Sequence, residues 1–214
     1  MPAQELPSVG QRIREERLKR DLSLRSLARD VGVSASLISQ IENEKSQPSV
    51  STLYAITSAL GISIQDVFGT GSAQVADQPR AVGETGPPST VLEALGSARG
   101  SRLGPYVTPA QRQVITLDSG VTWERLGALP HVATDFLMVT YDPGGTSSSN
   151  DGLMRHQGCE FGYLISGELV LTLGFEDIVL RPGDALSFDS TTPHRYRNEG
   201  TVPAVGVWFV TDQH

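Results

Sequence analysis

The sequence predicts a multidomain protein of class α + β, in which a small all-α domain precedes a β-sandwich or barrel. Residues 8–68 contain short apolar stripes with helical spacing, most of them preceded by a serine that can cap a helix. From Gly69 to about Gly104, Gly, Pro, Ala and Ser dominate, a composition typical of flexible linkers. From Tyr106 onward, β-rich runs alternate with turn residues. We therefore expect domains at 1–69 and 105–214, joined by a linker at 70–104.

Length and composition narrow the class of protein. A chain of 214 residues is long enough for one large domain or two small ones. It has no run of about eighteen apolar residues, so we expect no membrane span. The first residues lack the basic start and apolar core of a secretory signal. The single cysteine, Cys159, excludes an internal disulfide and is typical of a reducing compartment, so we expect a cytoplasmic protein.

The formal net charge of −7 is unevenly distributed along the chain. Residues 1–70 carry eight Lys and Arg against eight Asp and Glu, so their net charge is zero and all seven excess negative charges follow residue 70. Phosphate repels an acidic C-terminal part. If the protein binds a nucleic acid, only the N-terminal part is suited to it.

The densest motif of the chain spans residues 23–48, SLRSLARDVGVSASLISQIENEKSQP, and predicts two short helices across a tight turn. Ser23 and Gly32 bracket the first helix as N-cap and C-cap, and Ser34 caps the second. The apolar stripes consist of Leu24, Leu27, Ala28 and Val31 in the first helix and of Leu37, Ile38 and Ile41 in the second. Helices of about eight residues need other helices to cover their apolar faces.

The flanking sequence supplies these additional helices. A helix is expected from about Ser8 to Arg20, ahead of the motif. Another has Ser49 as its N-cap and ends at Gly61, and a last short one follows Ser63. Five short helices around one small core make a compact all-α domain.

The pattern LxxLAxxVGVSxSxISxIENxKSxPS resembles the helix-turn-helix of the XRE/Cro-type (lambda-repressor-like) DNA-binding proteins, and the resemblance covers about residues 9–68. It implies that the second motif helix enters the major groove of double-stranded DNA while the first crosses the backbone. It also implies an ion pair between Arg17 and Glu42, since a charge that faces the core needs a partner. The family positions place Ser34, Ala35, Ser36 and Gln40 at the base edges and Arg25, Asn43 and Lys45 at the phosphates.

The side chains at these positions favour particular bases. Gln40 can bond adenine through its amide, and the methyl group of Ala35 can contact that of thymine. No Arg or Lys occurs between Ser34 and Glu42, so guanine readout by this helix is expected to be weak. Because one asymmetric site is usually too short for affinity, we expect a homodimer on a palindromic operator with half-sites about one helical turn apart.

The C-terminal part contains the strand-like runs RQVITL, TDFLMVTY, FGYLIS, ELVLTL, IVLRPGD, ALSFD and AVGVWFV, whose spacing predicts a sandwich or barrel. Among them, GLMRHQGCEFGYLISGEL holds His156, Glu160 and Gly167, and PHRYRN holds His194 and Asn198. These segments resemble the two motifs of the cupin family. The resemblance implies a double-stranded β-helix barrel over roughly residues 112–210.

The cupin resemblance also implies a metal site with His156, Glu160 and His194 as ligands. The parity of His156 and Glu160 on an extended chain supports a shared interior. Two imidazoles and a carboxylate suit Zn²⁺, Fe²⁺, Mn²⁺ or Ni²⁺. Met154 replaces the first histidine of the family motif, and because a thioether is a poor ligand for these metals we expect it to line the wall of an effector pocket, with Tyr196 on the same face. A metal-free cupin whose histidines hydrogen-bond inside the pocket is the open alternative.

These features predict a transcriptional regulator, in which the XRE domain binds an operator and the cupin domain binds a small-molecule effector, with or without a metal ion. The alternative is an enzyme, because the same architecture and ligands resemble hydroxypropylphosphonic acid epoxidase, a mononuclear non-haem iron oxygenase. Two features favour the regulator. The recognition helix has a polar face suited to bases, and the linker is expected to separate the domains instead of clamping them over a substrate.

Overall fold

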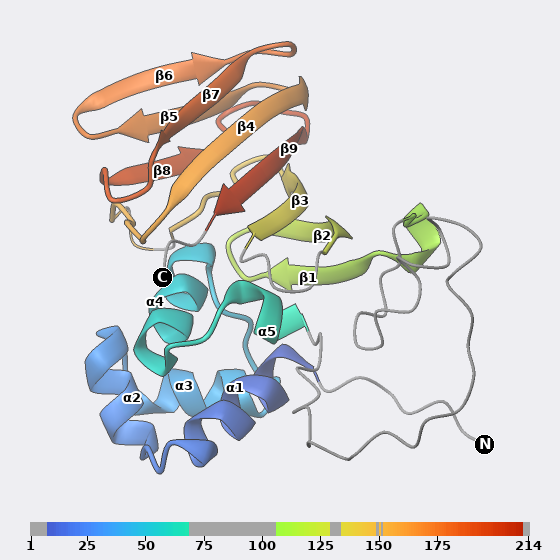
Figure 1. The fold of residues 1–214 in the computed structure, drawn as a ribbon. Coiled ribbons are helices and arrows are strands. Elements are labelled where there is room, and N and C mark those ends of the chain that lie inside the picture. The colour runs from blue at the N-terminus through green and yellow to red at the C-terminus, as the bar shows by residue number, and fades with distance from the viewer. Residues whose placement is uncertain (1–7, 69–105, 129–133, 149, 151, 212–214) are drawn as a thin grey trace, which may run out of the picture.

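The computed structural model describes residues 8–68, 106–128, 134–148, 150 and 152–211. Within them, helices α1 to α5 form one unit, and nine strands form a barrel that lies against it (Figure 1). The helices are α1 (Val9–Lys19), α2 (Leu24–Val31), α3 (Ala35–Glu42), α4 (Val50–Leu60) and α5 (Ile64–Phe68). The prediction of a five-helix domain followed by a β domain is confirmed, whereas the predicted linker lies outside the described residues.

Serine side chains start the helices where the sequence predicts them. The hydroxyl oxygens of Ser23, Ser34 and Ser49 each accept a hydrogen bond from the backbone N–H three residues further on, at 3.0, 3.1 and 3.2 Å. Satisfying these otherwise orphaned donors stabilises each helix start by about 1 kcal/mol. At the end of α2, Gly32 has a φ of 79°, a left-handed conformation that favours glycine, and it turns the chain toward α3.

The barrel consists of two antiparallel sheets with strand orders β1-β2-β3-β9-β4-β7 and β6-β5-β8. The strands are β1 (Gln113–Leu117), β2 (Val121–Gly127), β3 (Thr134–Tyr141), β4 (Cys159–Ser166), β5 (Leu169–Leu173), β6 (Glu176–Leu180), β7 (Ala185–Asp189), β8 (His194–Arg197) and β9 (Ala204–Thr211), with a short 3-10 helix, η1 (Pro109–Gln111), ahead of them. The last strand, β9, lies between β3 and β4, and residues of β3, β8 and β9 line one common interior. This arrangement places β4 and β8, which carry predicted metal ligands, on facing sheets.

Strands β2 and β8 are absent from the predicted strand-like runs. Strand β2 reads VTWERLG, and charged residues interrupt its apolar pattern. One of them, Arg125, points inward and is fully buried, because it lies at the junction with the helices and its guanidinium is 5.6 Å from the ring of Phe68. A strand that buries an arginine does not show the apolar alternation from which strands are predicted.

The helical unit packs directly on one end of the barrel (Figure 1). The backbone N–H of Ser51 donates to the carbonyl oxygen of Ser147 at 2.9 Å. The backbone N–H of Asp118 donates to the carbonyl oxygen of Pro48 at 3.1 Å. The side-chain amide of Gln65 donates to a backbone carbonyl of β3 across the same junction. The buried apolar side chains of helices and barrel form one continuous cluster.

The expectation that the linker separates the two domains is therefore wrong. A linker of that length limits only how far apart two domains can move. Their contact is decided by the surfaces, and Val50 on α4 and Phe68 on α5 are apolar side chains that become buried, at 3% and 6% exposure. Covering such side chains favours docking by about 25 cal/mol per Å² of apolar surface.

Candidate functional site

Helix α3 turns one face to the helical core and the opposite face to solvent. Ile38 and Ile41 are buried on the inner face. Among the residues predicted to meet base edges, Ser34, Ser36 and Gln40 are exposed and Ala35 is half-buried, and the predicted phosphate contacts Arg25, Asn43 and Lys45 are all exposed. The outer face of the motif is thus accessible to a large partner, as a groove-binding helix requires.

Two of these side chains already have a structural partner. The hydroxyl of Ser34 accepts the capping hydrogen bond from Leu37. The amide nitrogen of Asn43 donates to the carbonyl oxygen of Ser39 at 2.7 Å. Gln40 makes no side-chain hydrogen bond among those seen within the described residues, so its amide is the one most available to a base.

The predicted ion pair between Arg17 and Glu42 is confirmed. Nε and Nη2 of Arg17 donate to the two carboxylate oxygens of Glu42 at 2.6 and 2.8 Å, and Nη1 donates to the carbonyl oxygen of Leu22 at 2.7 Å. Both residues are buried. The hydrogen bonds that Arg17 donates to Glu42 outweigh burial and raise the pKa of Arg17. This two-pronged contact fixes the end of α3 against α1 and so orients the exposed face of the helix.

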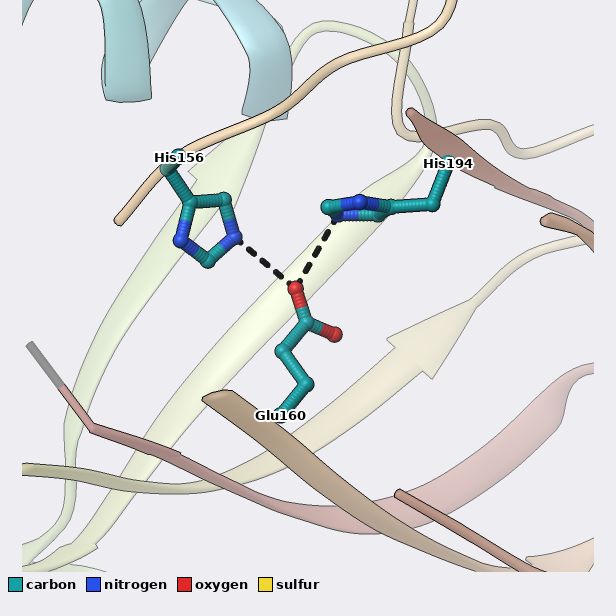
Figure 2. A group of neighbouring side chains, drawn as sticks. All are labelled: His156, Glu160 and His194. Atoms are coloured by element: carbon teal, nitrogen blue, oxygen red, sulfur yellow. Dashed lines mark hydrogen bonds and ion pairs between the residues drawn. The ribbon is translucent and has the colours of Figure 1, made fainter. Parts of the chain in front are cut away.

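The three predicted metal ligands converge inside the barrel (Figure 2). His156 lies in the segment before β4, Glu160 lies on β4, and His194 begins β8. Oε1 of Glu160 is 2.9 Å from Nε2 of His156 and 3.1 Å from Nε2 of His194. Adjacent ligand atoms around a divalent ion with bonds of about 2.0–2.2 Å lie roughly 3.0–3.4 Å apart, close to these two distances. All three ligand atoms lie within 4.8 Å of one another.

Backbone carbonyls fix the tautomers of both histidines. Nδ1 of His156 lies 3.0 Å from the oxygen of Gln157, and Nδ1 of His194 lies 2.8 Å from the oxygen of Thr192. Because a carbonyl can only accept, each Nδ1 carries a proton, and Nε2 is the ring nitrogen that faces Glu160. In the neutral imidazole this Nε2 has no proton and can bind a metal ion, whereas in the imidazolium it donates to Glu160. This is the arrangement by which metal-binding histidines are held in proteins.

The buried Nε2 of His194 tests whether these residues fit a metal ion. This nitrogen makes no hydrogen bond that meets normal geometry, although Oε1 of Glu160 lies 3.1 Å away. Two imidazole nitrogens and a carboxylate oxygen that all accept need a cation between them, either a proton or a metal ion. The residues present therefore fit a divalent metal.

Two further side chains, Tyr196 and Trp208, form a hydrogen-bonded chain to the other carboxylate oxygen of Glu160, Oε2. The hydroxyl of Tyr196 donates to Oε2 at 2.8 Å and accepts from Nε1 of Trp208 at 3.2 Å. Burial, with the nearby charge of Glu160, raises the pKa of Tyr196 well above its usual value, so the hydroxyl stays a donor at neutral pH. Burial also raises the pKa of Glu160, but the contacts of its carboxylate with His156 and His194 outweigh burial and lower that pKa to about 2. Glu160 is therefore an ionised acceptor at neutral pH.

A small cavity adjoins this carboxylate. It has a volume of about 30 Å³, enough for one or two water molecules. Met154 lines its wall beside Glu160, and Tyr196 lies on the facing strand. The remaining wall consists of Val50, Tyr54, Trp123, Leu137, Val139, Tyr141, Trp208 and Val210.

Val50 and Tyr54 are site residues that the sequence does not single out, and they belong to helix α4 of the helical unit. One signal could have found them. They are four positions apart and lie beside, not within, the stripe of Leu53, Ile56 and Leu60 that faces the helical core. A second apolar stripe on a short helix predicts a second surface to be covered.

The two halves of the chain match two family models. Residues 13–67 match the family described as Helix-turn-helix, and residues 137–210 match the family described as Cupin domain. The chain is thus a DNA-binding transcriptional regulator of the XRE-type helix-turn-helix class with a C-terminal cupin domain. No helix in the described residues is long and apolar enough to cross a membrane.

Relatives that match along most of the chain are named as regulators. The HTH-type transcriptional regulator PuuR of Escherichia coli (strain K12) is 28% identical over 191 residues, which covers 88% of this chain and 86% of PuuR. The HTH-type transcriptional regulator SutR of the same strain is 25% identical over 191 residues, with 88% and 85% covered. A crystal structure of an HTH_3 family transcriptional regulator from Vibrio cholerae has the same fold, with a TM-score of 0.61, 20% identity and 96% of each chain covered. These matches favour a regulator over the epoxidase-like alternative.

Proposed function

We propose that this regulator binds a palindromic operator as a homodimer and that a small-molecule effector controls its affinity for DNA at a divalent metal held by His156, Glu160 and His194. The observation that carries the proposal is the convergence of two Nε2 atoms on one carboxylate oxygen, in histidines whose Nδ1 atoms face backbone carbonyls. Such ligands suit Zn²⁺, Fe²⁺, Mn²⁺ or Ni²⁺. When bound, the metal supplies open coordination positions for a donor atom of the effector.

On the DNA side, we assign base contacts to Ser34, Ala35, Ser36 and Gln40 and phosphate contacts to Arg25, Asn43 and Lys45. The exposure of the outer face of α3 supports this assignment. With a glutamine and an alanine but no arginine on that face, contacts to A·T pairs are favoured. Because only Arg25 and Lys45 carry charge among these seven residues, we expect a shallow dependence of affinity on salt.

We propose a binding role for the barrel, not a catalytic one, and a cytoplasmic location in which the protein meets DNA. Two histidines and one carboxylate are also the ligand set of non-haem iron oxygenases. The regulator names of relatives that match along 88% of the chain support the binding role.

Replacing Glu160 with Gln tests the metal site. This change removes the only negative charge among the three ligands and keeps the shape of the side chain. We expect wild-type protein to bind one Zn²⁺ or Mn²⁺ per chain by isothermal titration calorimetry. Glu160→Gln should bind it at least about 100-fold more weakly, since loss of outer-shell partners alone costs about 10–100-fold.

The matched control is Glu124→Gln, which removes a carboxylate of the same barrel that pairs with Arg112 away from the site. It should bind metal like the wild type. A gel shift with DNA upstream of the gene, with and without metal, then shows whether metal changes operator affinity in the wild type and the control but not in Glu160→Gln. Wild-type protein that takes up no metal, or Glu160→Gln that binds it equally well, contradicts the proposal.

The homodimer needs a contact surface, and we assign it to the aromatic face, the outward side chains Phe136, Phe161, Tyr163 and Phe209 of β3, β4 and β9. Strand pairing sets Phe136, Phe209 and Phe161 side by side in one row. The four side chains are 40–51% exposed. The outward positions of these strands carry no charge: Thr134, Phe136, Met138, Thr140, Cys159, Phe161, Tyr163, Ile165, Val205, Val207, Phe209 and Thr211.

A second copy of the chain is the occupant that this face fits. In a protein of net charge −7, an uncharged surface removes the repulsion that two acidic barrels would otherwise have. Four half-exposed aromatic side chains and their neighbours form an apolar patch of roughly several hundred Å², the size that marks interfaces. A two-fold contact through one patch also gives the symmetry that a palindrome requires.

Phe209→Asp should separate the dimer, because it places a charge at the centre of the aromatic row. Sedimentation velocity should show a dimer for the wild type and a monomer–dimer dissociation constant raised about 30-fold or more in the variant. Phe175→Asp is the control, since Phe175 is a fully exposed aromatic residue at the turn between β5 and β6. A monomeric wild type, or equal effects of both variants, rejects this interface.

A further inference from the structure

Helix α4 of the DNA-binding unit contacts the metal site directly. The ring of Tyr54 stacks on the imidazole of His156, with ring centroids 4.2 Å apart and planes 5° from parallel. The same ring makes an edge contact with Trp123 of β2, at 5.9 Å and 69°. Tyr54 is therefore held between a metal ligand and the wall of the barrel.

Tyr54 also separates two spaces. The inner cavity beside Glu160 has a volume of about 30 Å³. A cleft of about 950 Å³ lies outside it, between helices α2 and α4 and the segment 152–157, and His156 lines this cleft. Tyr54 and Met154 are the residues that line both spaces. These two side chains therefore lie between the cleft and the cavity beside Glu160.

The backbone joins α4 to the same site from a second direction. Ser51, in the first turn of α4, donates its backbone N–H to the carbonyl oxygen of Ser147 at 2.9 Å. Ser147 in turn pairs with the backbone of Tyr196, through its N–H and through its hydroxyl, at 2.9 and 3.0 Å. On its other side, α4 packs against α2, the first helix of the DNA-binding motif. A chain of contacts thus runs from α2 through α4 and Ser147 to β8, the strand that carries His194.

We propose that Tyr54 is a positioning residue that couples occupancy of the metal site to the docking of the DNA-binding helices on the barrel. The coupling rests on the proposed metal-dependent function. Stacking on Tyr54 restricts rotation of the His156 ring and keeps Nε2 directed at the site, so docking of α4 strengthens metal binding. By thermodynamic reciprocity, metal binding strengthens docking of α4 by the same factor. Any ligand that displaces Tyr54 from His156 weakens the contact between α4 and the barrel.

Hydrogen exchange of the full-length protein, measured with and without Zn²⁺, tests this coupling. In the wild type, Zn²⁺ should slow exchange in α4 as well as in the strands around the site. In Tyr54→Ala, Zn²⁺ should still bind, about three- to tenfold more weakly because the ring contact is lost, and should protect the strands but not α4. Tyr54→Phe keeps the ring and should behave as the wild type does.

Ser58→Ala, an exposed position one turn further along α4, controls for any general loosening of the helix. Equal protection of α4 by Zn²⁺ in the wild type and Tyr54→Ala overturns the coupling, as does protection confined to the barrel strands in the wild type. Both results leave the metal site itself intact. If the wild type binds no Zn²⁺ in calorimetry, the metal-dependent function fails, and the coupling fails with it. Tyr54→Phe that behaves like Tyr54→Ala rules out stacking as the cause.

Discussion

Two glutamates, one in each half of the molecule, are equally buried but are satisfied in opposite ways. Glu42 at the end of α3 and Glu160 on β4 are each 4% exposed. The partner of Glu42 is a guanidinium that donates to both carboxylate oxygens at 2.6 and 2.8 Å. The partners of Glu160 are two imidazoles whose Nδ1 atoms face backbone carbonyls, and a tyrosine hydroxyl. The carboxylate of Glu42 has a permanent counter-charge, whereas that of Glu160 depends on a proton or a metal ion for one.

The difference separates a residue that stabilises the fold from one that is suited to binding a ligand. A buried carboxylate with a permanent cation is fully paired, and removing either partner exposes the other to the cost of an isolated buried charge. A buried carboxylate beside neutral imidazoles keeps its counter-charge variable, because a proton or a metal ion can supply it. The same side chain thus stabilises the helical unit in one environment and is suited to metal binding in the other.

The largest effect is expected for Glu42→Gln, which should lower the free energy of unfolding by about 3–5 kcal/mol. The charge of Arg17 would then be buried without a counter-charge. Chemical denaturation, followed by circular dichroism at the helical signal, measures the loss. The variant should bind Zn²⁺ with wild-type affinity once folded, because Glu42 lies in the helical unit and Glu160 in the barrel.

The matched control for this variant is Glu16→Gln. Glu16 is a glutamate of α1 that pairs with Lys19 and Arg20 at the surface. Exposed ion pairs of this kind contribute about 0–1 kcal/mol. If Glu42→Gln destabilises the protein no more than Glu16→Gln does, or if it abolishes metal binding, the distinction between the two buried glutamates is wrong.

Local signals explain why the helical unit could be predicted from the sequence. A serine hydroxyl caps a helix by accepting a hydrogen bond from the N–H three residues later, and a glycine ends a helix by taking a positive φ. Both effects act within one helical turn, so the sequence itself shows them. Ser23, Ser34 and Ser49 form their caps, and Gly32 forms the turn. The family pattern then pairs Arg17 with Glu42, which no local rule could do.

The contribution of α4 to the barrel could not be predicted in the same way. Tyr54 meets His156 although about a hundred residues separate them, and no pairing rule links a helix surface to a particular imidazole. The motif spacing identified His156, Glu160 and His194 because a cupin barrel places those positions together. It contained no information on what closes the end of the barrel, since that depends on how two separately folded surfaces fit.

Arg125 shows a third limit. Patterning treats an arginine in a strand as a surface position, yet this one is fully buried at the junction of the two units. Burial lowers the pKa of Arg125, while the charges of Asp135 and Asp66 oppose that shift. Asp66 belongs to α5 and Asp135 to β3, so the environment of this arginine exists only after the units dock. A residue whose surroundings come from two domains has no signature in the sequence of either.

A smaller effect is expected for Tyr196→Phe, and it sharpens the comparison because it changes a partner of Glu160 without touching a ligand. The variant loses the hydrogen bond of 2.8 Å to Oε2 of Glu160 and leaves Trp208 without its acceptor. Removing an outer-shell partner should weaken Zn²⁺ binding about 10–100-fold, measured by calorimetry.

Tyr141→Phe is the control, since Tyr141 is also a buried tyrosine of the pocket wall, and in the described residues it is the Tyr196 hydroxyl that bonds Glu160. If both phenylalanine variants weaken Zn²⁺ binding equally, the loss comes from the changed pocket wall, and Glu160 does not depend on Tyr196 for its orientation. If only Tyr196→Phe does so while both variants unfold at similar temperatures, the hydrogen bond itself sets the position of the carboxylate for the metal.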